Sequence, residues 1–87
     1  MSVEDHRRRI DEIDELIVGL LSERAQCAAR IGGVKRRNGT AVRDEARERE
    51  ILRKIATANR GPLGADALRR IYEAIIAACR ELETDGA

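Results

Sequence analysis

The sequence predicts an all-α fold of three helices, one long and two shorter, in a single domain over residues 1–87. Three features support this fold class. Apolar residues recur at helical spacing along most of the chain; they are almost all aliphatic, with one Tyr and no Phe or Trp; and the single proline divides the second half of the chain. No segment shows the alternation typical of a half-buried strand. A core of Leu, Ile, Val and Ala therefore indicates packed amphipathic helices.

The first helix is expected to begin after Ser2 and to end near Gly39. Ser2 followed by Asp5 is typical of a helix N-terminus, and Asn38 with Gly39 of a C-terminus. Between them, one row of residues keeps alternating spacings of three and four, the heptad pattern of a helix that packs along its whole length. The row consists of Ile10, Ile13, Ile17, Leu20, Arg24, Cys27, Ile31 and Val34.

The two shorter helices are expected over residues 42–60 and 65–83. Pro62, between Gly61 and Gly64, is the helix breaker that separates them. The apolar face of the second helix consists of Val42, Ala46, Ile51, Leu52 and Ile55, and that of the third of Leu68, Ile71, Tyr72, Ile75, Ile76, Cys79 and Leu82.

The length of the first helix indicates an intertwined homodimer. About 33 residues form a helix roughly 50 Å long, whereas a compact globule of this chain length has a radius of gyration of about 12 Å. The shorter helices, at roughly 25 to 30 Å each, cannot cover it. We therefore expect a second copy to pack along the first helix.

Charge and composition argue against several functional classes. With 17 Lys and Arg against 16 Asp and Glu, the net charge is +1, so nucleic-acid binding is not expected, and the clusters HRRR and KRR are interpreted as solvated helix ends. No stretch approaches the roughly 18 apolar residues of a membrane span. Cys27 and Cys79 lack the spacing of metal ligands or of a disulfide framework. We expect a cytoplasmic protein with free thiols and no metal.

Charged residues and glycines interrupt the first helix's apolar face. Arg24 takes the heptad position that Ile17 and Ile31 occupy one repeat before and one repeat after it. A charged residue at this position has three alternative roles: it sets the register of the packed helices, pairs with an acidic residue on another helix, or binds a ligand. Lys35 lies three turns beyond Arg24 on the same face; alternatively it is a solvated cation near the helix end. Gly32 and Gly33 weaken a helix, which indicates close approach of a packed helix or a ligand.

The two shorter helices carry similar mixed stripes at spacings i, i+3, i+4 and i+7. For the second helix the alternative is a solvated charged face. Three such faces can converge on one small polyanionic ligand. The stripes are Asp44, Arg47, Glu48 and Ile51 on the second helix, and Ile76, Cys79, Arg80 and Glu83 on the third.

Four segments in order resemble the all-helical class of chorismate mutases over nearly the entire chain. They are Arg7, IDEIDELIVGLLSERAQCAARIGGVK, VRDEARERE and IYEAIIAACRELE. The resemblance implies an intertwined dimer of three-helix chains. It also implies conversion of chorismate to prephenate by an intramolecular Claisen rearrangement, which needs no metal, cofactor or covalent enzyme intermediate.

The resemblance implies a role for each matched residue. Arg24 and Arg47 would bind the carboxylates of the dianionic substrate, and Lys35 its ether oxygen and a carboxylate. Glu48 and the Asp44 region would receive the ring hydroxyl. The walls around the ring would be Ile31, Ile51 and Ile76.

Arg7 would act in the other subunit. It precedes Arg24 by 17 residues, which is roughly 25 Å along a helix, so it cannot reach the same small ligand on its own chain. In the family this arginine enters the partner's site, and we expect two composite sites per dimer.

Two positions depart from one common version of the family pattern. Cys79 stands where many relatives have a serine that helps to bind a carboxylate, and a thiol is a weaker donor. Glu83 stands where some relatives have a glutamine that donates to the ether oxygen. An ionised carboxylate would repel the negative charge that develops there, so we expect Glu83 to act in its protonated form.

Two alternatives remain open from sequence. An isochorismate-pyruvate lyase shares the fold and a similar cationic pocket, although the resemblance is weaker across RDEARERE. The other alternative is a non-catalytic dimerisation or regulatory module of the shikimate pathway. However, a helix interface that served dimerisation alone would be more stable with leucine at position 24.

If Glu83 acts protonated, activity falls as pH rises through its titration, and the Glu83→Gln variant, which donates at every pH, gives a flatter profile. The measurement is kcat/KM against pH for both proteins. The same pH dependence in the two would contradict this role.

Overall fold

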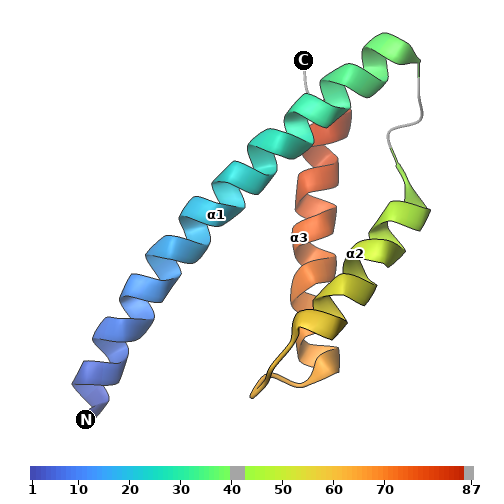
Figure 1. Cartoon of the computed structure of the whole chain (residues 1–87). Helices are drawn as coiled ribbons and strands as arrows, with labels where there is room; N and C mark the ends of the chain where they lie inside the picture. The colour runs from blue at the N-terminus through green and yellow to red at the C-terminus, as the bar shows by residue number, and fades with distance from the viewer. Residues whose placement is uncertain (40–42, 86–87) are drawn as a thin grey trace.

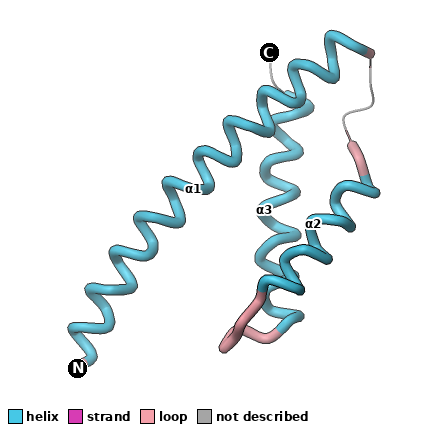
Figure 2. Tube along the Cα trace, viewed as in Figure 1, coloured by secondary structure: helices cyan, strands magenta, loops and turns pink. Residues whose placement is uncertain are grey.

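The computed structural model describes residues 1–39 and 43–85 and confirms the all-α class. Its helices are α1 (Val3–Asn38), α2 (Glu45–Ala58) and α3 (Ala65–Asp85), and no strand occurs in the described ranges (Figure 2). The polypeptide rises along α1, returns along α2 and rises again along α3 (Figure 1).

Hydrogen bonds at its ends explain the extent of α1. The Ser2 side chain accepts the Asp5 N–H at 3.1 Å while the Asp5 carboxylate accepts the Ser2 N–H at 2.9 Å, which completes the predicted capping box. These contacts lower the pKa of the Asp5 carboxyl group. The hydrogen bond from the Ser2 backbone has the largest effect, and the hydrogen bond from the Arg8 side chain has the next largest. At the other end Gly39, at φ 69°, adopts the left-handed conformation that favours glycine.

The second helix is shorter than predicted at both ends. Its expected start at Val42 lies outside the described residues, and α2 begins at Glu45 because Asp44 is its N-cap. The Asp44 carboxylate accepts the Arg47 N–H at 3.0 Å. The helix ends at Ala58 rather than at residue 60, since Asn59 is already extended. The third helix runs two residues beyond its predicted end.

The core lies where α1 and α3 cross, toward the C-terminal end of each. α3 packs against both α1 and α2, and the buried apolar residues are Ala28, Ile76 and Cys79. Gly32 is also buried. An added Cβ at Gly32 would lie 2.5 Å from Cα and 2.6 Å from the carbonyl oxygen of Glu83. The Glu83 carbonyl also accepts a hydrogen bond from Arg36. At Gly32 the close approach predicted from the glycine pair is therefore that of a packed helix, whereas a Cβ at Gly33 would meet only arginine side chains of its own helix.

The N-terminal part of α1 extends beyond the rest of the chain, as Figure 1 shows. The molecule measures 54 × 25 × 15 Å, with a radius of gyration of 15.9 Å, well above the ~12 Å of a compact globule of this length. Along this part Ile10, Leu16 and Leu20 are 53%, 60% and 63% exposed. Such a continuous apolar surface favours burial against another surface. Within the described ranges, no helix combines the length and apolarity needed to cross a bilayer.

The glycine pair gives a matched test of the helix crossing. Gly32→Ala is expected to lower the free energy of unfolding by about 1 to 3 kcal/mol, because the new methyl group overlaps the α3 backbone. Gly33→Ala is expected to be neutral or to stabilise by up to about 1 kcal/mol, since its Cβ would meet only the flexible ends of Arg37 at 3.6 Å and Arg36 at 3.9 Å. Urea unfolding at one fixed chain concentration measures both; equal effects of the two substitutions would contradict the crossing.

Candidate functional site

A pocket of about 240 Å³ lies between the C-terminal part of α1, the start of α2 and the C-terminal part of α3. It brings together every residue predicted for the site except Arg7. These residues are Arg24, Ile31, Lys35, Asp44, Arg47, Glu48, Ile51, Ile76, Cys79 and Glu83. Their convergence follows from helix packing, whereas their roles on a substrate remain predictions.

The α1 side of the pocket supplies two cations around one isoleucine. Arg24, Ile31 and Lys35 share a face because seven and eleven residues correspond to two and three turns. Arg24 is half-buried. In the part of the chain that the structure describes, no hydrogen bond or ion pair engages its guanidinium. The alternative of a salt bridge from Arg24 to an acid on another helix therefore does not occur within the described chain, and its cation lines the pocket.

The first turn of α2 places three charged side chains at the pocket. Asp44 caps the helix, so its carboxylate lies at the helix start beside Arg47 and Glu48. Arg47 is also hydrogen-bonded to Glu50, and this contact, together with the charge of Lys54, lowers the pKa of Glu50. The Arg47–Glu50 pair is about half exposed, and such surface pairs are weak enough to yield to a better partner.

The α3 side forms the buried floor and adds a residue that sequence reasoning did not assign to the site. Ile76 and Cys79 are buried, and Glu83 is held at the pocket by the contact of its backbone with Gly32. Arg80 also lines the pocket, and its guanidinium pairs with the Glu48 carboxylate at 2.8 Å. The sequence signal that could have assigned Arg80 to the site was its position in the mixed stripe predicted for the third helix. Cys27 and Ala28 complete the lining.

Arg7 does not reach the pocket of its own chain. It lies near the free end of α1, 69% exposed, with its guanidinium 3.0 Å from the Glu4 carboxylate, an intrahelical pair. This position agrees with the axial separation of Arg7 and Arg24 expected from sequence.

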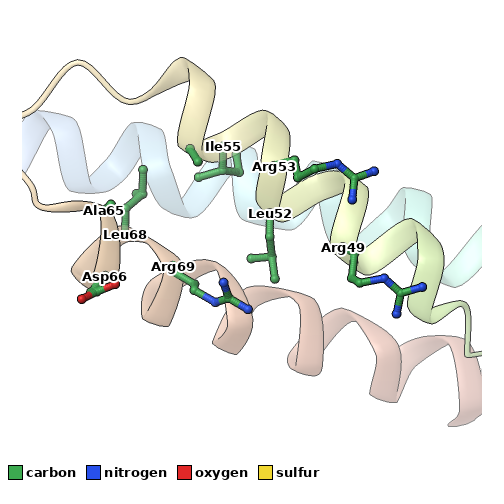
Figure 3. Close-up of a pocket in the computed structure, with 9 residues that line it drawn as sticks. Arg49, Leu52, Arg53, Ile55, Ala65, Asp66, Leu68 and Arg69 are labelled. Atoms are coloured by element: carbon green, nitrogen blue, oxygen red, sulfur yellow. The ribbon is translucent and has the colours of Figure 1, made fainter.

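A second cavity, of about 350 Å³, lies along the other end of the α2–α3 pair and contains none of the predicted residues. Leu52 points from α2 toward α3, Leu68 lies near the start of α3 beside Ala65, and Arg53 extends along α2 rather than toward α3 (Figure 3). Its charged side chains therefore do not converge as those of the smaller pocket do.

The smaller pocket combines cations, acids and aliphatic walls. Arg24, Lys35 and Arg47 suit the carboxylates of a small anion, while Ile51 and Ile76 suit an apolar body. In the described ranges no three His, Cys, Asp or Glu side chains are grouped closely enough to hold a metal ion. The arrangement can orient a polyanion and stabilise negative charge that develops within it.

Comparison with known proteins assigns a family. The family model for chorismate mutase type II matches residues 6–84. The chain is 44% identical over 81 residues to a bifunctional chorismate mutase/prephenate dehydratase of Aquifex aeolicus, covering 88% of this chain and 22% of that protein. It is 41% identical over 78 residues to the protein of that name from Neisseria gonorrhoeae, covering 90% and 21% respectively. The chain thus spans about a fifth of the length of these curated relatives.

A solved structure gives the same assignment. The chorismate mutase of Thermus thermophilus, in its form II, superposes with a TM-score of 0.93 at 29% identity, covering 95% of this chain and 94% of that one. Form I of the same enzyme superposes with a TM-score of 0.86 at 28% identity, covering 88% and 96%.

Proposed function

The chain belongs to the chorismate mutase type II family, and we propose that it converts chorismate to prephenate in the pocket between its three helices. The observation that carries this proposal is the convergence of Arg24, Lys35 and Arg47 with Glu48 and Glu83 around aliphatic walls. Helix packing does not require several cations to line one small cavity, whereas binding of a dianionic substrate does.

The reaction is intramolecular, so the protein has to supply geometry and charge. In the Claisen rearrangement the ether C–O bond breaks while a C–C bond forms within one molecule. Arg24 and Arg47 bind the two carboxylates and hold the folded conformer in which the reacting carbons approach. Lys35 stabilises the negative charge that grows on the ether oxygen. A rate enhancement on the order of 10⁶ requires about 8 kcal/mol of barrier lowering from these two effects.

The remaining predicted residues orient the ring and exclude water. Glu48, with Asp44 beside it, accepts the ring hydroxyl, and Glu83 contacts the ether oxygen. Cys79 contributes a weak donor near a carboxylate. The walls are Ile31, Ile51 and Ile76. Ile31 is 48% exposed in the single chain, and charge stabilisation is strong only in a dry site, so closure of the pocket requires a further surface.

A second copy supplies that surface in the arrangement we propose. The exposed apolar face of α1 extends away from the chain's own core and suits an isologous contact with the α1 of another copy. The partner's Arg7 then enters the pocket and adds a further cation. Each homodimer contains two such composite sites.

Substrate and variant assays test the activity. Incubation with chorismate is expected to yield prephenate, and incubation with isochorismate to release no pyruvate. Arg24→Leu should lower kcat/KM by roughly 10²-fold or more, because it removes a cation that contacts the reacting molecule. Arg30→Leu is the matched control, since Arg30 is exposed on α1 outside the pocket.

Two results would contradict the activity. Pyruvate release from isochorismate without prephenate formation from chorismate would favour the lyase. A wild-type chain that converts neither substrate, together with an Arg24→Leu dimer of higher stability, would favour a non-catalytic dimerisation module.

Mixing two inactive variants tests the contribution of Arg7 to the partner's site. Arg7→Ala and Arg24→Ala chains, refolded together in equal amounts, are expected to regain about a quarter of wild-type activity, because half of the dimers are mixed and each mixed dimer has one intact site. Arg24→Ala mixed with Arg47→Ala should regain nothing, since both changes affect side chains of one pocket. Equal activity in the two mixtures would contradict the composite site.

A further inference from the structure

An ion pair between two helices lies inside the pocket. The Arg80 guanidinium on α3 donates a hydrogen bond to the Glu48 carboxylate on α2 at 2.8 Å, although 32 residues separate them in sequence. The Arg80 and Glu48 side chains are only 28% and 20% exposed. By comparison, Arg69 and Glu73, which pair within α3, are 64% and 54% exposed. The Arg80–Glu48 pair is thus more shielded from water, where an ion pair restrains its partners more strongly.

The other oxygen of Glu48 faces a second arginine. The guanidinium of Arg43, immediately before the α2 N-cap, lies 3.6 Å from Glu48 Oε1, whereas Arg80 contacts Oε2. The carboxylate is therefore held from the loop before α2 and from α3. An ionised carboxylate has about four acceptor positions, so these contacts leave capacity for a hydroxyl donor from the pocket.

We propose that Arg80 is a positioning residue, which holds the Glu48 carboxylate where it accepts the ring hydroxyl of the substrate. The inference rests on the proposed function, because Glu48 has this role only if chorismate binds in the pocket. A glutamate side chain that is already ordered loses less conformational entropy when the substrate arrives. The planar guanidinium fixes the direction of the carboxylate as well as its distance.

Two other roles for Arg80 make different predictions. If Arg80 binds a substrate carboxylate directly, its effect on catalysis is independent of Glu48. If it only ties α3 to α2, its loss lowers stability and leaves the kinetic constants of the folded enzyme unchanged. A double-mutant cycle between the two positions separates these roles from positioning.

The experiment measures kcat/KM for chorismate in the wild type and in Arg80→Met, Glu48→Gln and the double variant. Positioning predicts that Arg80→Met lowers kcat/KM by about tenfold or more, and that the double variant is no worse than Glu48→Gln alone. Arg80→Lys, which keeps the charge but not the planar fork, should recover part of the loss. Arg69→Met is the matched control on the same helix and should behave as the wild type. Circular dichroism at the assay temperature establishes that each variant is folded.

The outcomes separate this inference from the proposed function. If the wild type converts chorismate but the losses of Arg80→Met and Glu48→Gln multiply in the double variant, Arg80 acts independently of Glu48 and the inference is overturned. The same holds if Arg80→Met matches Arg69→Met, or if its loss disappears once the unfolded fraction is corrected for. A wild type without chorismate mutase activity would overturn the proposed function, and this inference with it.

Discussion

The close crossing of α1 and α3 is the contact on which the rest of the structure depends. It occurs at Gly32, where the absence of a side chain lets the α3 backbone at Glu83 come within van der Waals distance. A larger residue there would separate the helices and open the pocket on one side. The same contact fixes the position of Glu83 relative to Arg24 and Lys35. The packing of α1 against α3 therefore determines part of the geometry of the candidate site.

The chain has little core to support this crossing. Only Ala28, Ile76 and Cys79 are buried apolar residues among those that the structure describes, and no described side chain is completely enclosed. Small domains bury a modest fraction of their surface, and here a 36-residue helix makes that fraction smaller still. The exposed apolar face of α1 and the open side of the pocket have the same cause, because one short chain cannot cover so long a helix. In our proposal a second copy closes both.

The charges of the pocket are arranged so that none of the helices holds a complete site. Arg24 and Lys35 come from α1, Arg47 and Glu48 from the first turn of α2, and Glu83 from α3. Catalysis by conformational restraint suits such an arrangement, because groups that approach from several directions fix a flexible substrate better than groups on one surface. The Arg80–Glu48 pair joins two of these elements inside the pocket.

The sequence by itself determined the three helices, the capping box at Ser2, the left-handed end at Gly39 and the residues that share each helical face. These features are local, since spacing along one helix decides them. The tertiary structure decided that Gly32 faces a helix rather than a ligand, and that Arg80 pairs with Glu48. The rotation and offset of one helix against another arise from side-chain packing between segments distant in sequence, which the periodicity of each segment does not encode.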